Sequence, residues 1–180
     1  MSGLSKGLGK VEVRLKWDPS PLGEPDDDLD IIAAVFRADD PHGTPAHLVY
    51  WDSRSPDGTI TLNRDSRTGQ GFGVDEAMTL EFSRMRPEHG RVVVGVAIQQ
   101  NEQPDGGRKC FRDVSGTRVE IHEGYDELAR DDFAGVAGCT AVTVAEFVRD
   151  ASGEWALRDG LHGFDGDPES FPAFMSRPRV

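Results

Sequence analysis

Positive charge, cysteine and long apolar runs are all scarce in this chain of 180 residues. Lysine and arginine together number 20 against 32 aspartates and glutamates, which gives a formal net charge of -12. Binding to nucleic acid or to an anionic membrane surface depends on clustered basic side chains, so the composition argues against both partners. No apolar stretch approaches the length of a membrane span, and direct membrane insertion is not expected.

The two cysteines, Cys110 and Cys139, match no spacing that is typical of a zinc site. The first ten residues, MSGLSKGLGK, lack the apolar core of a signal peptide, so a cytoplasmic location is the expectation. Thiols stay reduced in that compartment, and we therefore expect two buried thiols and no disulfide.

The chain is instead rich in turn residues and in alternating apolar runs. Its 21 glycines and 11 prolines separate short segments in which β-branched residues alternate with polar ones, as in KVEVRLKW. This pattern predicts about nine short strands in one domain over residues 1–180, folded as a mainly β, two-sheet β-sandwich with one or two short helices. The predicted strands lie within residues 10–17, 29–36, 47–51, 59–63, 77–82, 91–99, 110–114, 117–122, 139–150 and 154–159.

A short helix is expected in the tail, GDPESFPAFM. Asp167 is a suitable N-cap, and Pro168 suits the first helical position, where a missing N–H costs nothing. Pro172 is expected to keep this helix short or kinked.

Two segments are dense in carboxylates: DDDLD over residues 26–30, and RDSRTGQGFGVDE over residues 64–76. Asp26, Asp28 and Asp30 alternate, so in an extended chain they point to one side. Crowded like charges cost free energy unless a cation compensates them. Calcium, which takes six to eight oxygen ligands from carboxylates and backbone carbonyls in flexible geometry, suits such a place.

The glycines of the second segment fit the same interpretation. A backbone without side chains, at Gly69, Gly71 and Gly73, can turn its carbonyls toward an ion while Asp65 and Glu76 supply charge. Neither segment contains His or Cys, which argues against a transition metal; magnesium, with several retained waters, stays an alternative. An acidic loop that simply remains solvated is the other alternative.

Two better-known loops do not match. An EF-hand loop spans twelve positions, as does the segment from Asp65 through Glu76. However, Arg67 and Gly69 occupy the third and fifth positions, where that loop needs acids or amides. The GQGFG segment lacks the lysine of a phosphate-binding loop, and the acids beside it would repel phosphate.

Taken together, the motifs resemble those of the TerD-like proteins, a family associated with tellurite resistance and bacterial stress. The central motif of that family typically reads Gly-Asp-Asn-x-Thr-Gly-x-Gly-x-Gly-Asp-Asp-Glu, close to the segment over residues 64–76 here. The matching pieces run in order along nearly the whole chain: LSKG (4–7), LKWD (15–18), DDLD (27–30), SPDG (55–58), RDSRTGQGFGVDE (64–76), GEW (153–155) and GF (163–164).

The resemblance implies a β-sandwich that binds calcium between the Asp-Leu-Asp segment and the glycine loop. Acids and glycine carbonyls at the matching positions become the ligand candidates. They are Asp28, Asp30, Asp65 and Glu76, with Asp75 as a further acid and Gly69 and Gly71 as carbonyl donors.

The central motif departs from the family pattern at four positions. Arg64 replaces the first glycine, and Ser66 replaces the asparagine. Phe72 and Val74 stand where relatives often carry acids, so two negative charges have become apolar side chains. Because fewer charged ligands generally lower calcium affinity, we predict one strong calcium site and a second that is weakened or absent.

No nucleophile beside a base is evident, and the five histidines lie in unrelated contexts, as lone surface residues do. We therefore expect no enzyme activity, and expect instead a calcium-binding, non-catalytic stress-response module. Such a module would act by docking other proteins, including membrane-associated complexes. One alternative is a metal-assisted phosphate-ester hydrolase that uses the same acidic loops, with Arg67 as the nearest cation. The other is a purely structural domain.

Overall fold

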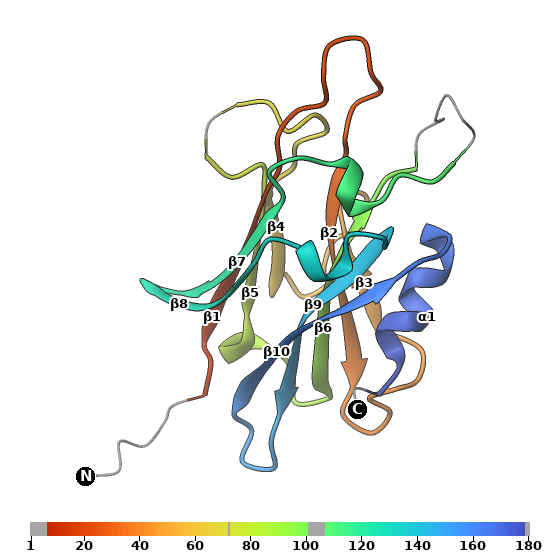
Figure 1. The fold of residues 1–180 in the computed structure, drawn as a ribbon. Coiled ribbons are helices and arrows are strands. Elements are labelled where there is room, and N and C mark those ends of the chain that lie inside the picture. The colour runs from red at the N-terminus through yellow and green to blue at the C-terminus, as the bar shows by residue number, and fades with distance from the viewer. Residues whose placement is uncertain (1–6, 72, 101–106, 179–180) are drawn as a thin grey trace.

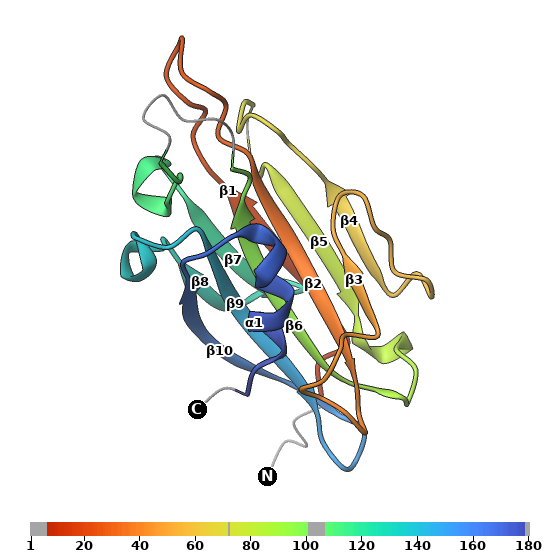
Figure 2. The same ribbon diagram turned by 90° about the vertical axis from the view of Figure 1, so that its right-hand side faces the viewer.

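The computed structural model describes residues 7–71, 73–100 and 107–178, which form two antiparallel sheets of five strands each. The sheets pack face to face, as Figures 1 and 2 show from two directions. The mainly β, two-sheet prediction is thus confirmed. The described residues form ten strands: β1 Lys10–Lys16, β2 Leu29–Arg37, β3 His47–Val49, β4 Ile60–Arg64, β5 Glu76–Glu81, β6 His89–Ile98, β7 Arg118–Glu123, β8 Asp126–Asp131, β9 Ala141–Arg149 and β10 Trp155–Phe164.

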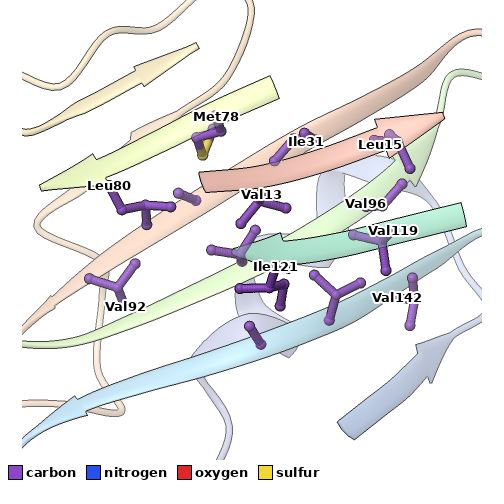
Figure 3. Packing of buried hydrophobic residues seen from close by; sticks show 14 of the residues in the cluster. Val13, Leu15, Ile31, Met78, Leu80, Val92, Val96, Val119, Ile121 and Val142 are labelled. Atoms are coloured by element: carbon purple, nitrogen blue, oxygen red, sulfur yellow. The ribbon is translucent and has the colours of Figure 1, made fainter. Parts of the chain in front are cut away.

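One sheet has the strand order β4-β5-β1-β7-β8, and the other has the order β10-β9-β6-β2-β3. Strand β1 lies at the centre of the first sheet and pairs with β5 on one side and with β7 on the other. Its sequence alternates because only one face meets the opposite sheet: Val11, Val13 and Leu15 are fully buried, while Glu12 and Arg14 are partly exposed. Figure 3 shows this shared core between the sheets.

Strands β2 and β6 are apolar on both faces because both of their faces are covered. Their inner faces join the main core, and the outer face packs against α1, a helix over Phe171–Ser176. Phe171 and Met175 of α1 lie fully buried against Ala34 and Phe36 of β2 and Val93 of β6. Cover by α1 on the outer face therefore explains why the sequence of β2 lacks the alternation seen in β1.

The start of the tail helix differs from the prediction. Asp167 makes no side-chain capping bond, and Pro168 begins a 3-10 turn, η4 (Pro168–Ser170), that leads into α1. Pro172 lies in the first turn of α1, where its missing N–H needs no partner. The helix is six residues long and therefore short, as predicted.

Three further expectations were wrong. Residues 110–114 are not a strand: Phe111–Asp113 form a 3-10 turn, η2, in which the carboxylate of Asp113 accepts a hydrogen bond from the backbone N–H of Cys110 at 2.8 Å. Strand β8 was missed because its charged sequence, DELARD, carries little apolar signal. The cysteines are free, as expected, but both are half-buried and not buried.

Candidate metal centre

Three acidic side chains from separate parts of the chain meet at one end of the sandwich. Asp30 lies in β2, Asp65 follows β4 directly, and Glu76 begins β5. One carboxylate oxygen from each lies within 4.8 Å of the other two. This is the end of the molecule at the top of Figure 1, where the loops that precede β2 and β5 lie. The two acidic segments that were predicted to converge therefore do so.

Glu76 is held there by a gap in the pairing of β2. Strand β3 is only three residues long and pairs with Ala33 to Val35, so it ends before Ile31. The backbone N–H of Ile31 donates instead to Oε2 of Glu76 at 2.7 Å. Because Glu76 belongs to the first sheet and Ile31 to the second, this carboxylate connects the two sheets.

A β-bulge brings Asp65 to the same place. The register between β4 and β5 shifts between Leu62 and Arg64, immediately before Asp65. An extra residue in one strand bends it and redirects the side chains that follow, which is why bulges are common beside functional sites. Asp65 is exposed, whereas Asp30 and Glu76 are buried, so the cluster opens to solvent on the Asp65 side.

Three acids at this end, Glu76, Asp28 and Asp75, each have a buried carboxylate oxygen that no donor among the described residues reaches. Glu76 is fully buried, and the oxygens are its Oε1 and the Oδ1 atoms of Asp28 and Asp75. A buried polar atom without a partner costs about 1–3 kcal/mol, and more when it is charged, so such atoms need a physical explanation.

Burial raises the pKa of three acids at this end. Burial, and then a hydrogen bond in which a protonated Glu76 donates to Asp65, raise the pKa of Glu76 to about 11. Burial, and then the charges of Asp30 and Asp65, raise the pKa of Asp28 to about 7. Burial also raises the pKa of Asp30, although a hydrogen bond from Gln99 opposes the rise. A raised pKa means that each of these carboxyls keeps its proton to a higher pH, and a bound cation would displace that proton.

The acids surround a cavity of about 220 Å³, which we call the acidic cavity. Gln99 donates a hydrogen bond from its amide to Asp30 Oδ2. The guanidinium of Arg67 lies 6.0 Å from the centre of the Trp51 ring, and its charge lowers the pKa of Asp28 against the larger effects that raise it. The lining residues are Asp28, Asp30, Trp51, Asp65, Arg67 and Gln99.

The chemistry of these groups fits a hard divalent cation. The donors are carboxylate and amide oxygens, and none of the described residues that line the cavity is a His or a Cys. A second group, Glu120, His122 and Glu127 on β7 and β8, has a similar spacing but a different charge balance. There Glu120 already pairs with Arg118 at 3.2 Å and with Arg130 at 3.4 Å. Of the two groups found among residues 7–71, 73–100 and 107–178, the first alone combines clustered acids with a buried carboxylate oxygen that no donor reaches.

Of the predicted ligands, Asp30, Asp65 and Glu76 form the cluster, and Asp28 lines the same cavity. Asp75 lies outside this cluster: its Oδ2 accepts a hydrogen bond from the backbone N–H of Trp17 at 2.9 Å, and its Oδ1 is buried without a partner. A ligand role for Asp75 stays a prediction.

The glycine loop needs its glycines for its backbone. Gly69, Gly71 and Gly73 all have positive φ, and a Cβ on Gly69 would lie 2.5 Å from the indole nitrogen of Trp17. The predicted coordination by the carbonyls of Gly69 and Gly71 stays a prediction.

Sequence reasoning missed two residues of the acidic cavity and one ion pair beside it. Trp51 and Gln99 line the cavity but follow strands without any motif that marks them. Asp27 is neutralised by Lys109 through a buried ion pair of 2.6 Å, a partner 82 positions away that no local pattern indicates.

The five histidines were expected to be isolated from one another, but two of them are in contact. The rings of His47 and His89 pack edge to face with their centres 5.3 Å apart, and burial lowers the pKa of His47. Neither residue lines the acidic cavity.

An antiparallel β-sandwich with an uncompensated group of carboxylates at one end defines the class of this protein. A family model described as the TerD domain matches residues 1–170, and the chain belongs to the TerD domain family. The resemblance drawn from the sequence motifs is therefore confirmed.

Relatives in the family span most of the chain. It is 28% identical over 170 residues to the tellurium resistance protein TerD of Serratia marcescens, which covers 92% of this chain and 86% of the relative. It is 31% identical over 165 residues to YceE, an uncharacterised protein of Bacillus subtilis (strain 168), which covers 89% of this chain and 84% of the relative. The crystal structure of SCO6318 from Streptomyces coelicolor A3(2), a homologue of the telluride resistance protein TerD, superposes with a TM-score of 0.89 at 54% identity, covering 96% of this chain and 100% of that one.

Among the described residues, no helix is long and apolar enough to cross a membrane.

Proposed function

We propose that this domain is a calcium-binding, non-catalytic stress-response module that acts by docking other proteins. The observation that carries the calcium proposal is the Glu76 carboxylate. It is fully buried, it uses one oxygen to join the two sheets, and its other oxygen is unpartnered within a group that includes Asp30 and Asp65. A divalent cation would give that oxygen a partner and offset the repulsion among the three acids.

Calcium suits the cluster better than magnesium does. The acids come from a rigid strand, β2, from a loop and from the first residue of β5, so their arrangement is irregular. Calcium accepts irregular coordination by six to eight oxygens, whereas magnesium demands near-ideal octahedral geometry and keeps its waters. Since Asp75 lies outside the cluster and Val74 beside it offers no ligand, one strong site is the proposal, with the second weakened or absent.

The non-catalytic part of the proposal is supported by what lines the acidic cavity. Among the described residues that line it, Arg67 is the one cationic side chain, and none is a Ser, Cys, His or Lys that could act as a nucleophile or base. The hydrolase alternative predicts turnover of 4-nitrophenyl phosphate that depends on calcium and is lost in Asp65→Ala. Our proposal predicts no turnover above buffer in either protein.

Calorimetric titration tests the calcium site. The native protein should bind one equivalent of calcium, and it should bind magnesium at least about tenfold more weakly. Glu76→Gln, which keeps the shape of the side chain and its acceptor oxygen, should abolish the strong binding. Glu120→Gln, an acid of the second group on β7, is the matched control and should bind calcium as the native protein does. Equal binding by both variants, or none by the native protein, would overturn the proposal.

A further inference from the structure

Four strands form the edges of the two sheets, and they differ in how well they are protected against pairing with another chain. An unprotected edge presents backbone N–H and C=O groups to any extended segment. Strand β3 is only three residues long, β8 carries the charged sequence DELARD, and β10 is interrupted by a bulge. Strand β4 begins Ile-Thr-Leu-Asn, without charge, and reaches its bulge only after Leu62.

The backbone of β4 turns two residues toward its free side. The N–H of Glu81 donates to the carbonyl of Thr59 at 2.8 Å, so residues 59 and 81 form a hydrogen-bonded pair. In an antiparallel ladder such pairs alternate, and the next one is Thr61 with Thr79. The N–H groups of Ile60 and Leu62 therefore point away from β5, toward the open edge.

A cleft of about 590 Å³ lies along this edge. Its walls include Tyr50 and Trp51 from the segment after β3, and Ile60 and Leu62 from β4. Trp51 is 50% exposed, and of the three large apolar side chains exposed in the described part of the chain it is the one that lines this cleft. An exposed tryptophan beside a free strand edge is a typical anchor for a partner's side chain.

The turn that carries Trp51 is held in place. Tyr50 and Ser53 exchange two backbone hydrogen bonds of 2.9 and 3.0 Å, and the hydroxyl of Ser53 donates to the carbonyl of Leu48 at 2.9 Å. Because this turn is already ordered, little conformational entropy would be lost when a partner packs against Trp51.

We propose that β4 and this cleft are a strand-addition site for an extended segment of a partner protein. The segment would pair with the N–H groups of Ile60 and Leu62 and place alternate apolar side chains against Trp51 and Tyr50. This inference deepens the proposed docking function and rests on it. A second copy of this chain is the less suitable occupant, because each copy carries a net charge of -12, whereas a neutral or basic segment meets no such repulsion.

The cleft also touches the acidic cavity. Trp51 and Asp65 line both spaces, so the strand-addition site and the cluster of acids share a wall. An ion that fixes the Asp65 carboxylate thus also fixes one end of the cleft, and calcium should strengthen segment binding.

The test uses a displayed library of random peptides of about ten residues, a length that spans one strand. The library is selected on the native protein in calcium. Enriched peptides are then synthesised, and their binding is measured by calorimetry with and without calcium. We expect alternating apolar residues in the enriched peptides, and protection of the backbone N–H groups of Ile60 and Leu62 from hydrogen exchange on binding.

A matched pair of variants separates backbone pairing from side-chain contact. Leu62→Ala and Leu62→Pro both remove the leucine side chain, but only proline removes the N–H on the open side, a position where an edge strand tolerates it. Peptide binding should be at least about tenfold weaker in Leu62→Pro than in Leu62→Ala, because the proline cannot donate the backbone hydrogen bond to the peptide. Far-UV circular dichroism confirms that both variants are folded.

Four outcomes would overturn the inference: no enriched peptide, protection at another surface, equal binding by the two variants, or a dimer in light scattering that Leu62→Pro dissociates. Calcium binding is measured in the same titrations before peptide is added. Loss of peptide binding with calcium binding intact therefore counts against the strand-addition site alone, and loss of calcium binding counts against the metal centre alone.

Discussion

Two parts of this molecule bury ionisable side chains, and they treat those side chains in opposite ways. Arg91 in β6 is 2% exposed, and its guanidinium donates to Glu146 at 2.7 Å and to the carbonyls of Pro41 and Arg177 at 2.9 and 3.0 Å. Glu76 is equally buried, yet one of its oxygens has no partner and its neighbours are also acids. The first arrangement joins the end of α1 to a sheet. The second leaves a site incomplete.

The molecule pairs other buried acids with cationic side chains. The lack of such pairs among the described acids of the cavity is therefore specific to that site. Within the same acidic segment, Asp27 is paired with Lys109 in a buried ion pair. The aspartates on either side of Leu29, Asp28 and Asp30, have raised pKa values instead. The fold neutralises Asp27 but leaves Asp28 and Asp30 crowded, and this crowding lowers the stability of the folded state. Binding of a cation would offset that loss.

The largest expected effect comes from removing the fully hydrogen-bonded guanidinium of Arg91. Arg91→Ala leaves Glu146 buried without its closest partner, so the free energy of unfolding should fall by about 3–5 kcal/mol, as measured by urea denaturation. Arg84→Ala, which removes an exposed ion pair with Glu81, is the control and should cost at most about 1 kcal/mol. A small loss in Arg91→Ala would show that the buried pair is not what holds α1.

The next largest effect is the stabilisation of the folded protein by calcium at the cluster that includes Glu76. Calcium at about a hundredfold excess over its dissociation constant should raise the free energy of unfolding by about 2.7 kcal/mol, because it binds the folded state alone. In Glu76→Gln the melting temperature should not respond to calcium, whereas in a folded Arg91→Ala protein it should still rise. A calcium shift that survives in Glu76→Gln would place the ion elsewhere.

The pH dependence of stability should report on the acidic cavity through Asp28. The folded-state pKa of Asp28 is raised from 3.8 to about 7, so the folded state binds its proton more tightly than the unfolded state does. That contribution to stability is fully present below about pH 4 and is lost as the pH rises through about 7. Without calcium, the Asp28→Asn variant should therefore lose less stability than the native protein between pH 4 and 7, as measured by thermal denaturation.

Calcium reverses this trend, because it binds the deprotonated acids. Its affinity should rise between pH 5 and 8, with protons released on binding, and calorimetry in buffers of different ionisation enthalpy measures that release. An affinity that does not change over this range would contradict the raised pKa values of Asp28 and Glu76.

The smallest effect is expected at the second acidic group. Glu120→Gln removes partly exposed ion pairs with Arg118 and Arg130, so the free energy of unfolding should change by at most about 1 kcal/mol. Urea denaturation measures this change. A loss as large as that in Arg91→Ala would show that exposure is a poor guide to the value of an ion pair here.

The parts of the fold that the sequence predicts are those with a local signal. The alternation of β1 and the turn residues around it predicted a half-buried strand. The two acidic segments and the family resemblance together predicted Asp28, Asp30 and Asp65, which line the cavity, and the buried Glu76 beside them. Strand β8 had no such signal, because a charged edge strand looks like a loop. The pairing of Asp27 with Lys109 and the position of Trp51 depend on contacts between distant segments, which periodicity does not encode.

The most direct test of the central claim is a crystal structure of this protein grown with calcium, with the ion located by its anomalous scattering. The account predicts one strong peak, with oxygens of Asp30, Asp65 and Glu76 about 2.3–2.6 Å from it. A structure with no peak there at saturating calcium, or with its strongest peak between Glu120 and Glu127, would contradict it.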